Sequence, residues 1–586
     1  MIPFGVTFYP DQWPVETWEE NFRNIKKTGF NIVRFGEMAW DWIEPDAGKF
    51  SFAGLDRAMD LCAKLGLKVL LGIPVSQVPP WFYRLYPNSR PVAQDGTLYP
   101  EMGPRPNICK DNPNYRRLAE RLTKKLVSRY KNHPALYMWQ VDNEPVYPPL
   151  DHTTGNDFCH CPHSRRAFVL WAKKKYGTLA KLNEVWGTKF WTNTYSRFED
   201  INTPKAGIWE AVSPHIFLDW FRFKTDSLAE WVSHLAKIVK AADKGHKVGT
   251  NGFIGISTRV PEHHLIAKGV DWYGLDVYPA GGKMAPPDLS FILDLWRSFA
   301  RAGGAEFQIT EMQGGQNVRW GSPDYVKGPE IEWWTKLAFA KGAQGLLYHA
   351  WRPPLFGAET AGFGILKADG SSTLRLKTIE KLAKGLEPRR SVAGSNKLAI
   401  AYLRSSDVQS YQEQGPPRGI AGQWEPVRVD IGLMYGLMSI QGAYQLAHAK
   451  YKGADFIFES DLTEGKLPYE TILLPNPYLL SRKQFENLKK WITAGGKLIT
   501  DARFGLKDEN GHLYQKPLLE ELLGVVWDHG EIKEEGFLEV IEGKPAKPQI
   551  IEKKLGKGKV VYANYSLFMN VRKGNKKFAS AAKRYL

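Results

Sequence analysis

The chain has 586 residues, of which 43% are apolar as in an ordinary globular protein, and it carries a formal net charge of +17. No uncharged apolar run reaches the roughly 18 residues of a membrane span, and no signal peptide precedes the first strand pattern, so we expect a cytoplasmic protein without a membrane partner. The positive charge could suggest nucleic acid, but no recognised nucleic-acid-binding motif accompanies it, and about half of the excess lies after Ile551.

Alternating strand and helix patterns fill the first 390 residues. The strand candidates, in chain order, are Gly5–Tyr9, Ile32–Gly36, Lys68–Gly72, Tyr137–Asn143, Lys247–Asn251, Asp271–Val277, Phe307–Glu311 and Gly345–His349. The clearest helical patterns are Val15–Thr28, Leu55–Leu65, Tyr115–Tyr130 and His215–Ala242. Eight strands favour a closed (β/α)8 TIM barrel over an open sheet. The gap after the fourth strand is too long for one helix and one loop, so we expect an elaborated loop over the catalytic face there.

A second α/β pattern follows an interruption near Leu386–Lys397. The alternation resumes with Leu398–Tyr402, Ile431–Gln441, Phe456–Phe458, Thr471–Leu474, Lys483–Thr493, Lys497–Asp501 and Lys559–Tyr562. This order indicates a smaller α/β domain of flavodoxin-like or amidotransferase-like type. We therefore predict a catalytic barrel over residues 1–390, an α/β domain over residues 391–570 and a basic C-terminal tail over residues 571–586.

Two runs end on a glutamate where a strand candidate ends. Gln140 to Glu144 closes the fourth strand, and Gln308 to Glu311 closes the seventh. The carboxyl ends of the strands of a TIM barrel meet on one rim, so both carboxylates could face one cleft. Two carboxylates across one cleft are what cleavage of a glycosidic bond requires. A single glutamate is more often solvated or salt-bridged, and we interpret the nearest alternatives, Glu37 and Asp142, as supporting charges at the rim.

Longer motifs carry a resemblance to a known family. These motifs are Gly5 to Pro14, Arg34 to Trp40, Gln140 to Glu144, Leu182 to Thr188 and Trp351-Arg352. In these runs, and over the larger part of its length, the chain resembles glycoside hydrolase family 42, the retaining β-galactosidases of clan A. The resemblance implies a catalytic barrel and a second domain through which family members form trimers.

The resemblance implies a role for each residue at the reacting end of the site. Glu144 would be the general acid and base, and Glu311 would be the nucleophile. Asn143, beside the acid, can hydrogen-bond the sugar 2-hydroxyl. Arg34 would hold Glu311 in its ionised form, and Tyr278 matches the tyrosine that family members place beside the nucleophile.

The resemblance also implies a sugar pocket. Its residues would be Arg105 against the galactose ring, Trp191 and Trp320 as aromatic walls, Trp351 as the floor, and Glu359 on the hydroxyls far from the anomeric carbon. Each tryptophan could instead be part of the core. Family members have a histidine three residues after that glutamate, where this chain has Gly362. The missing imidazole removes one polar group that would hold the sugar. Glycosides of glucose, mannose, fucose or glucosamine therefore remain possible substrates beside galactosides.

Three cysteines match a metal site of the family. Many members bind structural zinc with four cysteines, and Cys109, Cys159 and Cys161 match three of them, while Ser164 stands at the fourth position. The adjacent His163 could complete a Cys₃His site, because zinc also accepts histidine nitrogen. The alternative is a site that has lost its metal. Catalysis by two carboxylates needs no cofactor.

The sequence therefore predicts a retaining exo-β-glycosidase that hydrolyses terminal β-D-galactosyl residues of β-linked oligosaccharides. One alternative keeps the mechanism and changes the sugar, as in a β-glucosidase, β-glucosaminidase, β-mannosidase or β-fucosidase. Another is a barrel that binds carbohydrate or nucleic acid without catalysis, although such a protein would need neither glutamate. By resemblance we expect a homotrimer, and the intermingled Lys and Glu residues indicate the surface ion pairs of a thermophile.

Overall fold

The computed structural model describes residues 2–101, 107–147, 159–205, 213–253, 262–281, 283–318, 325–385, 397–414, 430–533, 536–541 and 547–586. The chain divides into two compact units, residues 1–167, 224–255 and 259–392 in the first and residues 168–223, 256–258 and 393–586 in the second. The change of unit at residues 392 and 393 lies near the predicted boundary, whereas the segment 168–223, predicted as a loop over the barrel, groups with the second unit. No helix in the described ranges is long and apolar enough to cross a membrane.

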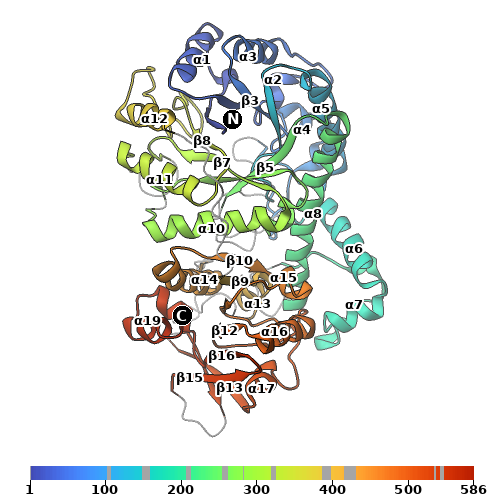
Figure 1. Ribbon diagram of the computed structural model, residues 1–586. Helices are drawn as coiled ribbons and strands as arrows, with labels where there is room; N and C mark the ends of the chain where they lie inside the picture. The colour runs from blue at the N-terminus through green and yellow to red at the C-terminus, as the bar shows by residue number, and fades with distance from the viewer. Residues whose placement is uncertain are drawn as a thin grey trace, which may run out of the picture. The chain divides into compact units, whose positions relative to one another are not determined.

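The first unit is built around a closed barrel of eight parallel strands (Figure 1). The strands are β1 (Phe4–Thr7), β2 (Ile32–Phe35), β3 (Lys68–Ile73), β4 (Leu136–Val141), β5 (Lys247–Phe253), β6 (Trp272–Val277), β7 (Glu306–Gln313) and β8 (Leu346–His349). Neighbours in the chain are neighbours in the sheet, and β8 pairs with β1 to close it. The predicted TIM barrel is confirmed, and each predicted strand forms with its ends shifted by at most a few residues.

Helices alternate with the barrel strands. They are α1 (Trp18–Lys27), α2 (Trp40–Ile43), α3 (Ala53–Lys64), α4 (Pro80–Leu85), α5 (Pro113–Tyr130), α6 (Pro162–Tyr176), α7 (Leu179–Val185), α8 (Pro214–Ala242), α9 (His263–Ala267), α10 (Pro286–Gly303), α11 (Gly328–Ala340) and α12 (Leu374–Lys384). Short 3-10 turns lie at Pro10–Gln12, Val15–Thr17, Pro87–Ser89, Phe190–Thr192 and Phe198–Asp200.

The local sequence explains where helix α5 begins and which of its faces is buried. Asn112 precedes α5, and its Oδ1 accepts the backbone N–H groups of Asn114 at 2.9 Å and Tyr115 at 3.2 Å. Pro113 then occupies the first helical position, where a missing N–H costs nothing. Further along α5, buried residues recur at three- and four-residue spacing and give the helix one apolar face.

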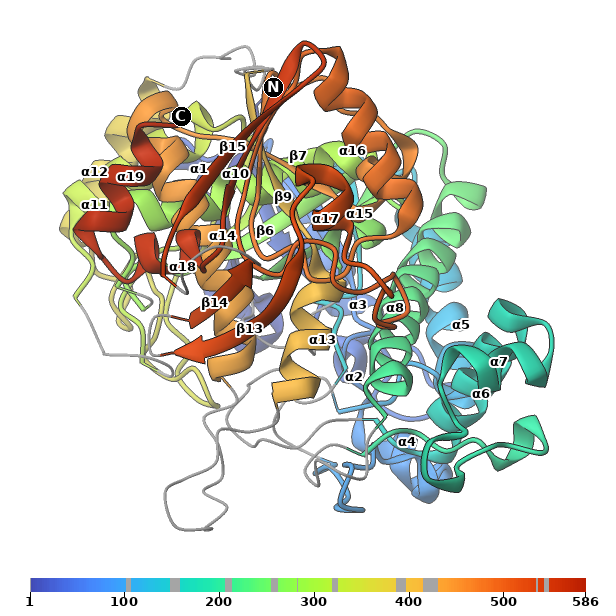
Figure 2. The same cartoon turned by 90° about the horizontal axis from the view of Figure 1, so that it is seen from below.

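The second unit holds a six-stranded sheet in the order β10-β9-β11-β12-β16-β15. Its strands are β9 (Leu398–Tyr402), β10 (Asp455–Phe458), β11 (Thr471–Leu474), β12 (Lys497–Thr500), β15 (Ile550–Leu555) and β16 (Gly558–Ala563). All pairs are parallel except β15 with β16, and the first five positions follow the doubly wound order of flavodoxin-like folds. The predicted α/β type of this domain is therefore confirmed. Strands β13 (Trp527–Lys533) and β14 (Gly536–Ile541) form a separate antiparallel pair, visible in Figure 2.

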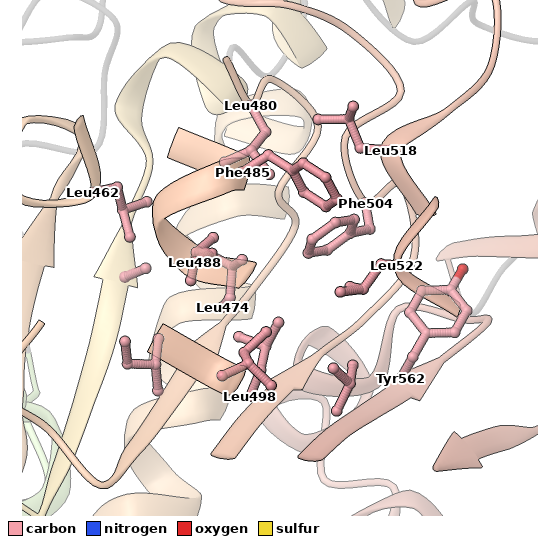
Figure 3. Close-up of a cluster of buried hydrophobic side chains, with 14 of the residues drawn as sticks. Leu462, Leu474, Leu480, Phe485, Leu488, Leu498, Phe504, Leu518, Leu522 and Tyr562 are labelled. Carbon is pink, nitrogen blue, oxygen red and sulfur yellow. The ribbon is translucent and has the colours of Figure 1, made fainter. Parts of the chain in front are cut away.

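The helices that follow β9 in the second unit pack with its sheet around a leucine-rich core. They are α13 (Arg404–Gln414), α14 (Asp430–Tyr451), α15 (Glu459–Glu464), α16 (Arg482–Ala494), α17 (Leu518–Leu523), α18 (Leu567–Arg572) and α19 (Lys576–Lys583). Figure 3 shows Leu474 and Leu498 from the sheet facing Phe485 of α16 and Leu522 of α17. The segment predicted as a basic tail instead forms α19. Its Phe578 ring packs 4.6 Å from that of Tyr565, a contact that charge counting alone could not reveal.

Candidate active site

Three carboxyl groups meet at the carboxyl-terminal rim of the barrel. Glu144 follows β4, Glu311 lies in β7 and Asp276 lies near the end of β6. One carboxylate oxygen of each residue lies within 4.8 Å of the other two, and all three side chains are buried. Retaining glycosidases place their two carboxyl groups about 5–5.5 Å apart. The structure thus brings the two glutamates singled out in the sequence into one site, at a spacing that suits double displacement.

Arg34, in β2, is the cation of this site. Its guanidinium is fully buried and donates to Gln140 Oε1 at 2.7 Å, to Glu311 Oε1 at 2.7 Å and to Asn143 Oδ1 at 2.5 Å. Glu37 Oε1 lies 3.3 Å from the same guanidinium. A positive charge at this distance stabilises the ionised form of Glu311. The role that the resemblance implied for Arg34 therefore agrees with its contacts.

Tyr278 holds the other oxygen of Glu311. Its hydroxyl donates to Glu311 Oε2, while Arg34 engages Oε1. Burial, together with the negative charge of Glu311, raises the pKa of the Tyr278 hydroxyl well above its usual range, so the group stays protonated and remains a donor. Both oxygens of Glu311 are therefore anchored, and its orientation in the cleft is fixed.

The backbone around Glu144 is strained. Asp142 and Glu144 have φ angles of 59° and 45°, in the left-handed region that side chains other than glycine rarely adopt. The Asp142 carboxylate stabilises this turn, since it accepts the Asn143 N–H at 2.8 Å and the buried Lys110 ammonium at 2.9 Å. Such strain persists only where the surroundings over-determine it, as they commonly do at active sites.

Amide side chains connect the turn to the neighbouring strands. Asn251 of β5 accepts the Glu144 N–H at 2.9 Å and donates to Asn143 Oδ1 at 2.8 Å and to Asp276 Oδ2 at 2.5 Å. Gln140 Nε2 also donates to Asn143 Oδ1, at 3.1 Å. The buried Nδ2 of Asn143 finds no hydrogen-bond partner among the described residues. A buried donor without a partner costs free energy, so this one is available for a substrate oxygen.

Asp276 was not assigned a role from the sequence. It stands two residues before Tyr278, which directly follows β6, and this two-residue spacing was the signal available. Burial, with the charges of Glu311 and Glu144, raises the pKa of the Asp276 carboxyl well above its usual range. Thr310 Oγ1 lies 2.7 Å from its Oδ1, and Gly274 makes room for that threonine, because a Cβ there would lie 2.2 Å from Thr310 Oγ1.

The residues predicted to line the sugar pocket lie in different places. Glu359 is partly exposed and lies 3.4 Å from Nε2 of His349, a residue that the sequence analysis did not single out. Trp351 is buried, donates to Asn21 Oδ1 of α1 at 3.1 Å and packs against Phe30, so it belongs to the layer between barrel and helix rather than to a sugar floor. Trp191 is 62% exposed and lies in the second unit. Arg105 and Trp320 lie outside the described residues.

The predicted metal ligands meet in part. The Sγ atoms of Cys109, Cys159 and Cys161 lie within 4.8 Å of one another, and all three cysteines are buried and free. His163 is not a member of this group. Ser164 Oγ lies 3.1 Å from Cys109 Sγ, at the corner where the resemblance implied a fourth cysteine. Three thiols in this arrangement suit zinc, which favours sulfur ligands at structural sites.

Known proteins resemble this chain over most of its length. A family model described as β-galactosidase of glycoside hydrolase family 42 matches residues 7–388, and one described as β-galactosidase trimerisation domain matches residues 453–535. A β-galactosidase of Heyndrickxia coagulans is 30% identical over 516 residues, which cover 87% of this chain and 73% of that protein. The β-galactosidase BgaB of a Geobacillus strain is 29% identical over 532 residues, covering 89% and 75%.

A solved structure shares the fold. The β-galactosidase of the Antarctic haloarchaeon Halorubrum lacusprofundi superposes with a TM-score of 0.85, covering 98% of this chain and 90% of that one, at 24% sequence identity. The barrel and the following α/β unit are thus a known combination of folds.

The Lys110–Asp142 ion pair generates a prediction about stability. Asp142→Asn leaves the fully buried Lys110 ammonium without its counter-charge, which typically costs about 3–5 kcal/mol. We expect the midpoint of thermal unfolding, measured by calorimetry, to fall by several degrees. Glu332→Gln, which removes the half-buried partner of the exposed Lys336 on α11, is the control and should leave the midpoint unchanged. Equal midpoints for Asp142→Asn and the unmodified protein would show that the buried pair contributes nothing.

Proposed function

Because the chain belongs to glycoside hydrolase family 42, we propose that it hydrolyses terminal non-reducing β-D-galactosyl residues with retention of the anomeric configuration. The observation that carries this proposal is the approach of Glu144 and Glu311 to within 4.8 Å at the rim of the barrel, with Arg34 bound to Glu311. A short separation leaves no room for a water molecule between sugar and carboxylate, and this favours double displacement over direct attack by water.

In the first step, Glu311 attacks the anomeric carbon while Glu144 donates its proton to the glycosidic oxygen. The bond from carbon to the leaving oxygen breaks, the aglycone departs as an alcohol, and the sugar becomes an ester of Glu311. In the second step, Glu144 takes a proton from water, whose oxygen attacks the same carbon and releases Glu311. Two inversions at one carbon give net retention.

The surrounding groups supply the charge balance for these steps. Arg34 and Tyr278 stabilise Glu311 as an anion before attack and as a leaving group afterwards. The Asn143 Nδ2, which has no partner among the residues that the structure describes, suits a hydrogen bond to the 2-hydroxyl, an interaction that strengthens in the transition state. The mechanism uses only groups of the chain, the substrate and water, so we propose that catalysis uses no cofactor.

The two alternatives, another sugar preference and a barrel without catalysis, are less well supported. The curated relatives are named β-galactosidases, which favours galactose over the other sugars. A barrel that only binds carbohydrate would need neither the paired carboxylates nor the strained turn at Glu144. The most direct reading of the site is hydrolysis of β-linked galactosides.

We also propose a homotrimer, assembled through the second unit. Residues 453–535 match the model described as a trimerisation domain, which is the support for this step. A thermophilic origin is consistent with surface networks such as that of Glu521, which lies 2.5 Å from Arg482 and 2.8 Å from Lys489. The cytoplasmic location stays a prediction.

The stereochemistry of the product tests the mechanism. We expect the purified protein to release β-galactose first from an aryl β-D-galactoside, with the α anomer appearing only by mutarotation, because two displacements restore the starting configuration. Proton NMR of the anomeric region during the first minutes resolves the two forms. Initial release of α-galactose would contradict double displacement, and faster turnover of another aryl glycoside in the same assay would favour another sugar.

Removal of the nucleophile is a second prediction. Glu311→Ala should lose at least roughly a thousandfold in kcat, since catalytic groups that act as a unit have effects of this order. Added azide should restore part of the turnover and form an α-galactosyl azide, because the small anion attacks from the space that the side chain vacates. Glu37→Ala is the matched control, as it removes a different acid from Arg34 and should show no rescue by azide. Unchanged turnover in Glu311→Ala would refute the assignment.

We further propose that Cys109, Cys159 and Cys161 hold a structural zinc ion, supported by their mutual approach. We expect purified protein to contain about one zinc per chain by mass spectrometry of the metal, since three thiolates form most of a structural site. Cys161→Ser should lose the metal and unfold at a lower temperature, whereas Cys62→Ser, at a buried cysteine outside the group, should keep it. Metal-free protein purified without chelator would identify a site that has lost its zinc.

A further inference from the structure

His349, the last residue of β8, lies at the wall of the site. Its Nδ1 is 3.0 Å from Thr7 Oγ1 of the neighbouring strand β1, and its Nε2 is 3.4 Å from Glu359 Oε2. Only 7% of the histidine side chain is exposed, against 26% for Glu359. Nδ1 of His349 is therefore fixed by Thr7 of the barrel, and Nε2 points to the Glu359 carboxylate, which is partly exposed.

Three aromatic rings place this imidazole beside the reacting groups. The ring centroids of Tyr9 and Tyr278 each lie 6.1 Å from that of His349, and the centroid of Phe363 lies at 5.4 Å. Tyr278 donates to Glu311, and Tyr9 donates to Glu37 at 2.8 Å. His349 thus adjoins the tyrosine that holds the nucleophile.

Position 362 cannot hold an imidazole without rearrangement. A Cβ built on Gly362 would lie 2.6 Å from Val318 Cγ2 and 3.1 Å from the Glu359 carbonyl oxygen. A contact of 2.6 Å is shorter than packed atoms allow, so the Val318 side chain would have to move before a side chain could stand at position 362. Val318 packs against position 362, and the imidazole that lies near Glu359 comes from strand β8.

The pair has the chemistry to bind a sugar hydroxyl. A hydroxyl group both donates and accepts, so it can accept from Nε2–H and donate to the carboxylate in one geometry. The separation of 3.4 Å is longer than the 2.7–2.9 Å of a tight charge-assisted hydrogen bond. Burial lowers the pKa of His349, but its hydrogen bond to Glu359 and the charge of Glu311 outweigh this, and the net pKa is raised, which favours a protonated donor.

We propose that His349 and Glu359 together bind one hydroxyl of the galactosyl ring remote from the anomeric carbon, at C3, C4 or C6, and that His349 is a specificity-determining residue of this enzyme. The assignment rests on the proposed function, because it takes the sugar ring to be held with its anomeric carbon at Glu311. It adds a residue from the barrel strand to a pocket that Gly362 would otherwise leave without an imidazole.

The test combines enzyme variants with deoxy sugars. His349→Phe is measured on p-nitrophenyl β-D-galactoside and on its 3-deoxy, 4-deoxy and 6-deoxy derivatives. On the parent we expect kcat/KM to fall about 10- to 100-fold, the range for a hydrogen bond to a charged group. On the one derivative that lacks the bound hydroxyl, the loss should shrink to about threefold or less, because the contact is already absent. A merely structural histidine would give the same loss on all four substrates.

Controls separate this inference from folding and from the proposed function. His349→Gln keeps an amide donor and should recover part of the loss with the same substrate pattern, so it serves also if the phenylalanine variant folds poorly. His133→Gln, at an imidazole paired with Asp60 at 3.1 Å, should match the unmodified protein. Equal losses on all four sugars, or no loss on the parent, would overturn the role of His349. If another glycoside is the better substrate, its own deoxy series gives the same comparison, and only the galactose assignment fails.

Discussion

The buried guanidinium of Arg34 is the contact on which the geometry of the site depends. A cation removed from water is costly unless its partners surround it, and Arg34 reaches side chains on β4 and β7 as well as Glu37 beyond its own strand. Each of these hydrogen bonds fixes a strand end relative to the others. The ends of β2, β4 and β7 are therefore held together by charge as well as by the ladder of the barrel.

The positive charge of Arg34 also limits how many of the neighbouring acids can be ionised at one time. Glu37, Glu144, Glu311 and Asp276 bring four acids to one buried cation, and three of them approach within 4.8 Å of each other. Like charges at this distance cannot all ionise, so the cluster must keep protons. Arg34 and Tyr278 favour the anion at Glu311, whereas burial and the charges of Glu311 and Glu144 raise the pKa of Asp276. A nucleophile must be ionised, and these contacts favour the anion at Glu311 over the anion at Asp276.

Much of this could be predicted from the chain alone, and the remainder could not for definite reasons. Strand periodicity identified all eight barrel strands, and the position of Glu144 and Glu311 at strand ends placed them on one rim. Side-chain direction after a strand is not encoded by spacing, so Trp351 turned out to face α1 instead of the sugar pocket. The amide network through Asn251 connects it with Glu144, more than a hundred positions away, and no local sequence pattern predicts such a contact.

His349 illustrates a more general limit of reasoning by position. The missing histidine at position 362 left other sugars open beside galactose, because matching a motif assumes that a function stays at its place in the chain. What the pocket requires is a donor beside Glu359, and β8 offers one that Thr7 fixes across the β1–β8 pair, where Val6 and Tyr348 are in register. A donor on a barrel strand is more rigidly placed than one on a loop, because the ladder on both sides restrains its backbone. A pocket that draws its imidazole from the framework can therefore give up the loop residue without losing the contact.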